Sequence, residues 1–502
     1  MLLRELLTEV QARCLMGSEE TEVKSLSIDS REVEPGAAFV CIPGAVYDGH
    51  SFAAQAVEKG AAVLVVERWG EIVFENGSET HLEPLQKICS DKGVTVVQTQ
   101  DARLALAHMA AAWYGYPAKR LVTIGITGTK GKTTSTYMVK SILENAGRKV
   151  GLIGTNEVII GRKHVPAGNT TPESLVLHGI FREMADTGLD TVVMEVSSQA
   201  FKLKRTEGIL FDYGIFTNLS PDHIAPAEHK DFEEYLSCKR KLFQQCRVGI
   251  INGDDPYAEA VTQGHTCRLE TFGLGENCML RAEDIRFVRS GGRLGMEFRV
   301  SGVMDFSVQV PLPGRFSVYN ALTAISICRQ FRVRESDIQR SMLAARVKGR
   351  IEPVSGPKDY TILIDYAHNP MALESLLNTL REYHPSRLIC LFGCGGNRPT
   401  LRRKEMGRIS GRLSDLSILT SDNPRDEDPL EILEEIREGV AETEGEYVVI
   451  PDRREAIRYG IQRAKEGDIL VLAGKGHEDY QEIRGVKYPM DEREIVQEIL
   501  TE

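Results

Sequence analysis

The residues best suited to chemistry form a glycine-rich stretch, Gly125-Ile-Thr-Gly-Thr-Lys-Gly-Lys-Thr-Thr134, between an apolar segment and a helical one. Glycines let backbone N–H groups surround phosphate oxygens, a lysine reaches the β- and γ-phosphates, and a hydroxyl at the helix start binds Mg²⁺. The strict P-loop pattern has a glycine at position 126, where this chain has Ile126. We therefore predict a variant phosphate loop that binds a nucleotide, rather than an ordinary glycine turn. The predicted contacts are Gly128, Thr129, Lys130, Gly131, Lys132, Thr133 and Thr134.

Two further polar residues are candidates for a metal site beside this loop. Nucleotide-binding proteins commonly place an acid at the end of a neighbouring strand to hold Mg²⁺. Glu195 follows the apolar segment 191–194, and His223 comes after another, 214–217. From the residues alone, Glu195 could instead cap the next helix, and an isolated histidine is more often structural. Both interpretations stay open for these two residues.

Short apolar segments alternate with amphipathic helical segments along the chain. Predicted strands include 61–66, 121–126, 191–194, 388–392 and 469–472, and predicted helices include 104–114, 135–145 and 335–345. This alternation favours parallel sheets built from strand–helix–strand units. The expected fold class is therefore α/β.

The length of the chain indicates several domains. At about 150 residues per domain, 502 residues correspond to roughly three. One boundary is expected near Tyr116-Pro-Ala-Lys119, where an alanine-rich helix ends at a proline before a strand begins. A second is expected near Val347-Lys-Gly-Arg350. The predicted domains are 1–117, 118–347 and 348–502.

The composition excludes several classes of protein. With 72 acidic and 61 basic residues the net charge is −11, which argues against a protein that coats nucleic acid or an anionic membrane. Ten cysteines without a Cys-x-x-Cys pair indicate reduced thiols, and Cys390 and Cys394 are interpreted as part of a buried strand and turn rather than as zinc ligands. The N-terminus does not resemble a signal peptide, and no stretch resembles a membrane span. We expect a soluble cytoplasmic protein that acts as a monomer.

Three motifs in the same order resemble those of a known enzyme family. Gly128-Thr-Lys-Gly-Lys-Thr133, Asn218 to His223 and Asp365-Tyr-Ala-His-Asn-Pro370 are similar to motifs of the ATP-dependent Mur ligases of peptidoglycan synthesis. These enzymes add amino acids to a UDP-linked muramoyl peptide. The resemblance implies an N-terminal α/β domain that binds the UDP substrate, a central P-loop domain with a parallel sheet, and a C-terminal Rossmann-like α/β domain.

Four further stretches resemble the MurE branch of that family, the UDP-N-acetylmuramoyl tripeptide synthetases. They are Asp29-Ser-Arg31, Asn169-Thr-Thr-Pro172, Glu195-Val-Ser-Ser-Gln199 and Gly474-Lys-Gly-His-Glu478. By this resemblance the residues that bind the UDP-muramoyl-dipeptide are Ser30, Asn169, Thr170, Thr171, Ser197 and Arg205. Hydroxyls, an amide and a guanidinium suit a sugar diphosphate that needs many directional hydrogen bonds. The chain has Leu203 where the family often has a glutamine.

The resemblance also implies how ATP and Mg²⁺ are held. Lys132 would stabilise charge on the transferring phosphoryl group, and Thr133, Glu195, His223 and Lys239 would hold Mg²⁺, with Lys239 carbamylated by CO₂ to N6-carboxylysine. Further residues expected to reach the nucleotide are Asn320, Arg350, Asp365, Tyr366, His368 and Asn369. The linker from Ile224 to Glu234 departs from the Leu-Asp-Tyr-His-Gly form common in the branch.

The added amino acid is expected to be read by Ser421-Asp-Asn-Pro-Arg425, which resembles the branch signature for meso-diaminopimelate. Lysine-adding members replace the arginine. Diaminopimelate carries a distal carboxylate that lysine lacks, and a guanidinium can bind a carboxylate through two parallel hydrogen bonds. The chain has Asn397 where the family usually has aspartate. The implied binding residues are Arg398, Asp422, Asn423, Pro424, Arg425, Gly474 and Glu478.

The sequence therefore predicts an ADP-forming ligase that joins meso-diaminopimelate to UDP-N-acetylmuramoyl-L-alanyl-D-glutamate through an acyl phosphate. Alternatives with related chemistry are a lysine-adding ligase, which Arg425 argues against, and a folylpolyglutamate synthetase, which the N-terminal domain with Ser30 argues against. A kinase is a third alternative. A non-catalytic, nucleotide-gated binding protein is an alternative of another class.

Overall fold

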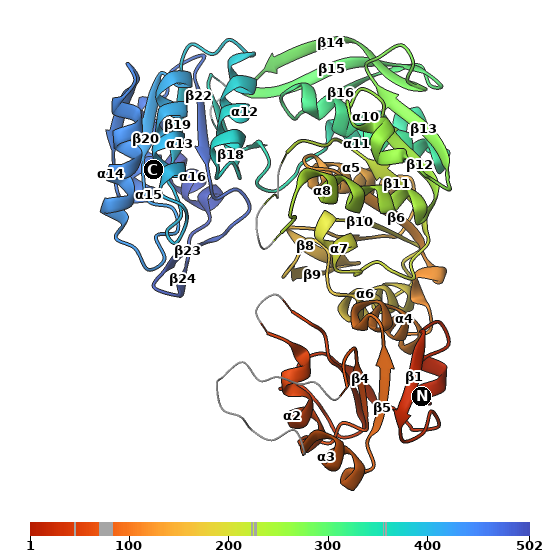
Figure 1. Ribbon diagram of the computed structural model, residues 1–502. Helices are drawn as coiled ribbons and strands as arrows, with labels where there is room; N and C mark the ends of the chain where they lie inside the picture. The colour runs from red at the N-terminus through yellow and green to blue at the C-terminus, as the bar shows by residue number, and fades with distance from the viewer. Residues whose placement is uncertain (45–46, 70–83, 222–223, 225–227, 355, 357–358) are drawn as a thin grey trace. The chain divides into compact units, whose positions relative to one another are not determined.

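The computed structural model describes residues 1–44, 47–69, 84–221, 224, 228–354, 356 and 359–502. His223 lies outside these residues. The chain divides into two compact units, and their helices and strands are labelled in Figure 1. The first unit comprises Met1–Lys132, Gly147–Ile251 and Asp255–Glu270, and the second comprises Thr133–Ala146, Asn252–Asp254 and Thr271–Glu502.

The first unit begins with a five-stranded sheet in the order β1-β5-β4-β3-β2. Its elements are α1 (Leu3–Leu6), β1 (Ala12–Met16), β2 (Ser25–Ser27), β3 (Ala37–Val40), η1 (Gly49–Phe52), α2 (Ala53–Glu58), β4 (Val63–Val66), α3 (Pro84–Lys92), β5 (Thr95–Thr99) and α4 (Ala102–Trp113). Alternate side chains of β3 and β4 enter two separate apolar clusters, one shared with α1 and α4 and the other with α2 and α3. The sheet is therefore buried on both faces, as the apolar runs predict.

The rest of the first unit contains a second, mainly parallel sheet in the order β12-β11-β6-β10-β7-β8-β9. Its elements are η2 (Pro117–Arg120), β6 (Val122–Thr127), β7 (Val150–Ile153), β8 (Glu157–Ile160), β9 (Lys163–Pro166), α6 (Ser174–Asp186), β10 (Thr191–Glu195), α7 (Ser198–Lys202), β11 (Phe211–Phe216), α8 (Phe232–Arg240), η3 (Lys241–Gln244), β12 (Cys246–Asn252) and α9 (Ala258–Thr262). Glu195 pairs with Ile126, and Phe216 pairs with Thr127. The carboxyl ends of β10 and β11 therefore flank the residues that lead into the phosphate loop.

The second unit holds the helix after that loop and an antiparallel group of strands. Its elements are α5 (Lys132–Asn145), β13 (Arg268–Gly273), which crosses the boundary between the units, β14 (Leu280–Ser290), β15 (Arg293–Gly302), β16 (Phe306–Val310), α10 (Arg315–Gln330) and α11 (Glu335–Leu343). The helix α5 begins three residues before the predicted 135–145. Because Gly131 adopts a φ of 86°, the loop turns directly into the helix at Lys132.

The C-terminal part of the second unit is a six-stranded sheet in the order β17-β18-β22-β19-β20-β21. Its elements are β17 (Glu352–Pro353), β18 (Thr361–Asp365), α12 (Pro370–Arg381), β19 (Leu388–Phe392), α13 (Leu401–Leu413), β20 (Leu416–Leu419), α14 (Pro429–Ala441), β21 (Glu446–Val449), α15 (Arg453–Arg463), β22 (Ile469–Ala473), the hairpin β23 (Tyr480–Ile483) and β24 (Val486–Pro489), and α16 (Glu492–Thr501). Strands β18 to β22 are parallel, so their carboxyl ends form one edge, where open α/β sheets bind ligands.

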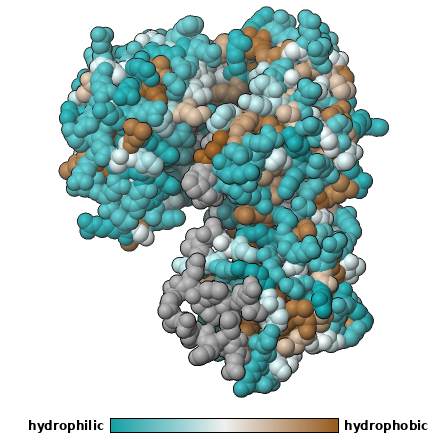
Figure 2. Space-filling view, viewed as in Figure 1, coloured by the Kyte–Doolittle hydropathy of each residue, from teal (hydrophilic) through white to brown (hydrophobic). Residues whose placement is uncertain are grey.

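Figure 2 shows a mainly hydrophilic face on which apolar residues form small separate groups. Within the described residues, no helix is both long enough and apolar enough to cross a membrane. The ten cysteines are free, and burial raises the pKa of the Cys390 and Cys394 thiols to about 12.

A buried ion pair fixes the carboxyl edge of the C-terminal sheet. Arg453 at the start of α15 and Glu492 at the start of α16 are both almost fully buried, and Arg453 Nε donates to Glu492 Oε1 over 2.8 Å. The same guanidinium donates to the carbonyl oxygen of Ala473 over 3.0 Å and to that of Ser421 over 3.2 Å. One arginine therefore holds the ends of β22 and β20, immediately before the predicted binding residues.

Replacing Arg453 with methionine should destabilise the protein strongly. The change leaves the Glu492 carboxylate buried without its cation, which typically costs about 3–5 kcal/mol. The free energy of unfolding in urea measures the loss. Arg458→Met is the matched control, because Arg458 pairs with Glu502 on the surface, where an ion pair contributes under about 1 kcal/mol. Equal losses in the two variants would contradict this account.

Candidate active site

The phosphate loop is tightly packed around Gly128. This residue has a φ of 153°, and a Cβ added to it would lie 2.0 Å from Thr217 Oγ1, so only glycine fits. Lys132 Nζ donates to the carbonyl oxygens of Gly128 over 2.9 Å and of Thr129 over 3.1 Å. The ammonium predicted to reach a nucleotide phosphate therefore lies over the loop.

Residues that follow β11 hold the loop in place. Asn218 Oδ1 accepts the backbone N–H of Lys130 over 2.9 Å, and its Nδ2 donates to the carbonyl oxygen of the same residue over 3.0 Å. Thr217 Oγ1 donates to that carbonyl oxygen over 2.8 Å. On α8, the Tyr235 hydroxyl lies 2.9 Å from Thr129 Oγ1. The motif that begins at Asn218 therefore supports the loop directly.

Lys239 lies beside the same loop. It is on α8, its side chain is 1% exposed, and its Nζ donates to the carbonyl oxygen of Gly128 over 2.9 Å. The ammonium also lies 4.5 Å from the centroid of the Tyr235 ring. The structure thus brings together Lys239 and the phosphate loop, whereas the described residues do not include His223.

Glu195 is buried at the carboxyl end of β10. Its Oε1 accepts the backbone N–H of Thr155 over 2.9 Å, and its Oε2 accepts the hydroxyl of the same threonine over 3.1 Å. It does not cap α7, because Ser197 is the N-cap and its Oγ accepts the backbone N–H of Ala200 over 3.1 Å. The capping interpretation of Glu195 is therefore wrong.

Three of the residues predicted to bind the UDP substrate lie next to Glu195. Thr171 Oγ1 donates to the carbonyl oxygen of Glu195 over 2.9 Å and accepts the backbone N–H of Ser197 over 3.1 Å. Thr170 Oγ1 lies 3.1 Å from the Thr155 hydroxyl, which itself contacts Glu195. A short hydroxyl-rich cluster thus surrounds the end of β10.

The other three predicted UDP-substrate residues have different surroundings. Arg205 Nη2 lies 2.6 Å from Glu173 Oε1, and Arg205 Nη1 donates to the carbonyl oxygen of Thr171 over 3.0 Å. Asn169 is exposed in the turn before α6. Ser30 lies after β2 in the N-terminal sheet, where its hydroxyl donates to Gln55 Oε1 over 2.7 Å.

The unusual linker before α8 is anchored by a buried histidine. His229 Nε2 lies 2.9 Å from Ser198 Oγ, and its Nδ1 lies 3.4 Å from Glu234 Oε2. Desolvation and the nearby Lys202 lower the pKa of His229 below its ordinary value. The described end of the linker is therefore attached to α7 and α8 despite its departure from the family form.

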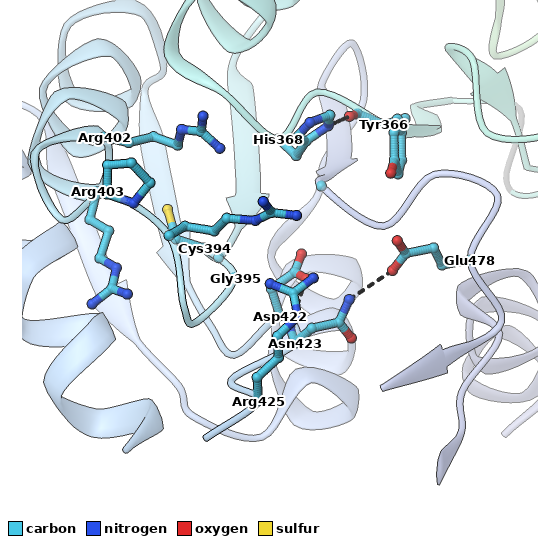
Figure 3. Close-up of a pocket in the computed structure, with 14 residues that line it drawn as sticks. Tyr366, His368, Cys394, Gly395, Arg402, Arg403, Asp422, Asn423, Arg425 and Glu478 are labelled. Atoms are coloured by element: carbon cyan, nitrogen blue, oxygen red, sulfur yellow. Dashed lines mark hydrogen bonds between the residues drawn. The ribbon is translucent and has the colours of Figure 1, made fainter. Parts of the chain in front are cut away.

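A second candidate site is a pocket at the carboxyl edge of the C-terminal sheet (Figure 3). The lining residues are Tyr366, His368, Gly393, Cys394, Gly395, Arg398, Pro399, Arg402, Arg403, Asp422, Asn423, Arg425, Gly474 and Glu478. Six of the seven residues predicted to bind the amino acid line this pocket. Among the described residues Pro424 is the exception, and its carbonyl oxygen packs against Gly396.

The arginines of this pocket differ in how they are paired. Figure 3 shows the adjacent Arg402 and Arg403 pointing in different directions. The buried Arg403 binds Glu427 and Glu435 through Nη atoms at 2.7 and 3.1 Å, and it lowers the pKa of the Glu427 carboxyl. Neither Arg402 nor Arg398 forms a side-chain hydrogen bond or ion pair with the described residues. Two guanidiniums in the pocket thus have no acidic partner in that part of the chain.

Arg425 is held by the protein in a strained backbone conformation. Its φ is 52°, which costs a non-glycine residue about 1 kcal/mol or more. Its Nη1 donates to the carbonyl oxygen of Gly396 over 2.7 Å, and its Nε donates to Glu482 Oε2 over 3.2 Å. The guanidinium is therefore oriented at the edge of the pocket, with part of its hydrogen-bonding capacity already used.

Asn397 contacts two acidic side chains. Its φ of 56° is in the left-handed region, which asparagine tolerates well. Its Nδ2 donates to Asp426 Oδ2 over 2.7 Å, and its backbone N–H donates to Glu427 Oε1. Because an aspartate here would place like charges together, the amide suits the two neighbouring acids.

The acidic side of the pocket contains Asp422, Asn423 and Glu478. Asn423 Nδ2 donates to Glu478 Oε2 over 2.9 Å, so this amide orients the carboxylate through a bond within the protein. Asp422 Oδ1 accepts the backbone N–H of Asn423 over 2.7 Å. A Cβ added to Gly474 would lie 2.7 Å from Asp422 Oδ2, so the strand end approaches this carboxylate closely.

The predicted nucleotide residue Asp365 is buried at the end of β18. Its Oδ1 accepts the backbone N–H of Ala367 and its Oδ2 that of Ile351, both over 2.8 Å. Desolvation raises the pKa of its carboxyl, while the nearby Arg350 opposes the rise. Asp365 therefore joins β18 to the segment around Arg350, whose guanidinium lies 5.2 Å from the centroid of the Tyr366 ring.

Three further predicted nucleotide residues of the second unit lie after β18, at the start of α12 and on α10. His368 lines the pocket, and its Nδ1 lies 2.8 Å from the carbonyl oxygen of Tyr366. Asn369 is the N-cap of α12. Asn320 is buried on α10, where its Oδ1 lies 3.5 Å from Ser135 Oγ.

The structure adds residues that the sequence did not single out. Tyr235 and Thr155 contact the phosphate loop and Glu195, and no motif in the chain marks them in advance. Arg402 lines the pocket and belongs to the basic run Arg402-Arg-Lys404, which was a usable signal. Lys475 lies inside the stretch Gly474-Lys-Gly-His-Glu478 and is fully buried beside Glu478.

Three models of one protein family match most of the chain. Residues 22–114 match the model described as Mur ligase family, catalytic domain, residues 126–328 match the Mur ligase middle domain, and residues 349–476 match the Mur ligase, glutamate ligase domain. The relatives below are similar over their whole length. The chain belongs to the Mur ligase family.

Two relatives and one solved structure with the same name are similar to this chain. The UDP-N-acetylmuramoyl-L-alanyl-D-glutamate--2,6-diaminopimelate ligase of Clostridium perfringens is 39% identical, with 100% of this chain and 99% of the relative covered. The ligase of the same name from Caldanaerobacter subterraneus subsp. tengcongensis is 40% identical, with 97% of each chain covered. A solved structure of a ligase of that name is 27% identical, with a TM-score of 0.71 and coverage of 100% of this chain and 99% of the other. The three-domain α/β architecture expected from the sequence is that of this family.

Gly128→Ala should weaken ADP binding by at least about tenfold, because loop amides that bind phosphate depend on an exact backbone position. The added methyl group would overlap the Thr217 hydroxyl. Isothermal titration calorimetry gives the affinity. Gly168→Ala is the control, because a Cβ there meets no atom within 4 Å. Wild-type affinity in Gly128→Ala would show that the loop does not bind the nucleotide.

Proposed function

We propose that this protein is the ATP-dependent ligase that joins meso-2,6-diaminopimelate to UDP-N-acetylmuramoyl-L-alanyl-D-glutamate, with release of ADP and phosphate. The observation that carries the proposal is the pocket with Arg398, Arg402 and Arg425, since it offers cations to a ligand with two carboxylates. The names of the similar relatives support the same reaction. The free cysteines are consistent with action in the reducing cytoplasm, and we propose that the protein acts there as a monomer.

The proposed reaction has two steps and needs no protein nucleophile. A carboxylate oxygen of the muramoyl dipeptide attacks the γ-phosphorus of ATP, the bond to ADP breaks, and an acyl phosphate forms. The neutral amine of the amino acid then attacks the acyl carbon, phosphate leaves, and the amine loses a proton. Lys132 and the loop N–H groups stabilise charge on the phosphoryl oxygens during the first step. Lys130 is proposed to contact phosphate as well.

Three of the four proposed ligands, Glu195, Thr133 and carbamylated Lys239, would offer oxygen atoms, which Mg²⁺ prefers. Glu195 offers a carboxylate that is buried and oriented by two bonds from Thr155. We propose that Glu195, His223, the Thr133 hydroxyl and carbamylated Lys239 hold the ion. When bound, it neutralises charge on the γ-phosphate.

The proposed carbamate on Lys239 rests on the position of this residue. A carbamate forms when the neutral amine adds to the carbon of CO₂ and a proton is released, which converts a cation into an anion. Lys239 is almost fully buried beside the loop, where an unmodified ammonium would add positive charge next to Lys132. A carbamate there would supply oxygen ligands instead.

The three ligands are assigned to three proposed domains. Residues 1–117 and the hydroxyl-rich segments of 118–347 would bind the UDP-muramoyl-dipeptide. The second domain would also bind ATP through the loop and Asn320. Further nucleotide contacts, namely Arg350, Asp365, Tyr366, His368 and Asn369, would come from the third domain. Residues 348–502 would bind the amino acid. The UDP-substrate contacts are proposed to be Ser30, Asn169, Thr170, Thr171, Ser197 and Arg205.

Charge complementarity supports diaminopimelate over lysine as the amino acid. Diaminopimelate has two carboxylates, whereas lysine has one. Arg398 and Arg402 lack acidic partners in the described part of the chain, and Arg425 Nη2 forms no hydrogen bond there. A site built to bind a polar group can reject a ligand that lacks this group by several powers of ten in kcat/KM.

The direct test supplies purified protein with ATP, the UDP-muramoyl-dipeptide and meso-diaminopimelate. We expect ADP, phosphate and a UDP-muramoyl-tripeptide in equal amounts, the last identified by mass spectrometry. A non-catalytic binding protein would release no phosphate. A kinase would turn over ATP equally well without the amine.

Arg425→Ala should reduce the preference for diaminopimelate over lysine by at least about tenfold in kcat/KM, because the distal carboxylate loses a charged hydrogen-bond donor. Parallel kinetics with both amino acids measure the ratio. Arg437→Ala is the matched control, because Arg437 pairs with Glu434 on the surface of α14. An unchanged ratio in Arg425→Ala would remove Arg425 from the proposed site.

Lys239→Ala should abolish most activity, and short carboxylates such as formate or acetate should restore part of it by supplying the missing oxygen ligands. Phosphate release against carboxylate concentration measures the rescue. Lys132→Ala serves as the control, since a carboxylate cannot replace its ammonium. Absence of rescue in Lys239→Ala would count against the carbamate.

A further inference from the structure

Lys475 is a fully buried cation in the pocket region that the proposed reaction does not use. It lies two residues after β22, and its side chain has 0% exposure. Its Nζ donates to Asn423 Oδ1 over 2.8 Å and to Glu478 Oε2 over 3.0 Å. Because a buried ammonium needs compensation by acceptors, these two contacts determine where Lys475 can lie.

The three side chains form a closed set of hydrogen bonds. Asn423 Nδ2 donates to Glu478 Oε2 over 2.9 Å, so this single oxygen accepts bonds from both Asn423 and Lys475. Asn423 Oδ1 also accepts the backbone N–H of Glu482 over 2.9 Å. Within the described residues, Glu478 Oε1 forms no hydrogen bond. One carboxylate oxygen is thus fixed by the protein, and the other is left for a ligand.

The loop that carries Lys475 and Glu478 has little room to move. Gly474 and Gly476 have φ values of 112° and 53°, which favour glycine. A Cβ at Gly476 would lie 2.5 Å from Tyr366 Cβ, so the loop backbone is packed against this residue. Arg493 Nη2 donates to the carbonyl oxygen of Gly476 over 2.8 Å. The position of the Glu478 carboxylate therefore depends chiefly on its side-chain partners.

We propose that Lys475 is a positioning residue that orients Glu478 so that Oε1 accepts a hydrogen bond from an ammonium group of the bound amino acid. This inference rests on the proposed function. Lys475 acts through Glu478 and Asn423 and does not touch the ligand. Its positive charge also balances the Glu478 carboxylate before the ligand binds. The arrangement affects binding of the amino acid more than the phosphoryl transfer step.

Lys475→Met tests the proposal, because methionine has a similar length and no charge. We expect the KM for diaminopimelate to rise at least about tenfold, since the Glu478 carboxylate loses its orientation. The KM for ATP and kcat at saturating diaminopimelate should change by less than about threefold, because the phosphate loop is untouched. Steady-state kinetics with each substrate varied in turn separate these effects.

Lys487→Met is the matched control. Both lysines lie over the same ring, with Lys475 Nζ 5.4 Å and Lys487 Nζ 4.1 Å from the centroid of Tyr480. Lys487 is on the exposed hairpin strand β24 and has no carboxylate partner among the described residues. This variant should keep the wild-type KM for diaminopimelate.

A double-mutant cycle shows whether Lys475 acts through Glu478. If it does, Lys475→Met combined with Glu478→Gln should raise the KM no more than Glu478→Gln does alone. If the increases in KM of the two single variants multiply in the double variant, the two residues act independently and the proposal is overturned. So would an unchanged KM for diaminopimelate in Lys475→Met.

A second variant, Lys475→Gln, tests whether an effect of Lys475→Met is due only to misfolding. Lys475→Gln keeps a hydrogen-bond donor and removes the charge, and melting temperature and ADP affinity report whether either variant is folded. If both variants lose ADP affinity together with structure, Lys475 is only a structural residue and the proposal fails. A wild-type protein that does not use diaminopimelate would refute the proposed function instead, which distinguishes the two failures.

Discussion

Buried charges at the carboxyl edge of the C-terminal sheet must be compensated within the protein, because an unpaired buried charge costs several kcal/mol. Three cations there meet this requirement: Arg453 binds Glu492, Arg403 binds Glu427 and Glu435, and Lys475 binds Glu478. These pairs hold the strand ends and the loops after them in fixed positions. They also leave Arg398 and Arg402 without acidic partners in the described part of the chain, which makes the pocket receptive to carboxylates.

In the first unit, the phosphate loop is held against the ends of neighbouring strands. Parallel pairing places the ends of β10 and β11 beside β6, so Glu195 and Asn218 reach the loop region without long connections. Tyr235 and Lys239 on α8 contact the same loop from farther along the chain. The loop is therefore fixed by side chains from several elements, in agreement with a role in orienting phosphates.

The fold class and most of the strands could be predicted from the sequence, because buried parallel strands are continuous apolar runs, as at 388–392 and 469–472. Glycine-rich motifs located the loop and the pocket, since close backbone approach at Gly128 and Gly474 excludes other residues. The hydrogen-bond partners of the individual site residues could not be predicted from the sequence. Asn423 lines the pocket as expected, but the sequence does not show that its amide also donates to Glu478. Thr155 has no local signal, because only the tertiary structure brings it to Glu195.

The central claim is that the C-terminal pocket selects a ligand with two carboxylates by charges that the protein has already arranged. The most direct measurement is the ratio of kcat/KM for meso-diaminopimelate to that for L-lysine, with the wild-type enzyme, ATP and the UDP-muramoyl-dipeptide. The account predicts a ratio of at least about 10², because a polar site rejects a ligand that lacks its partner group. A ratio near one would contradict it.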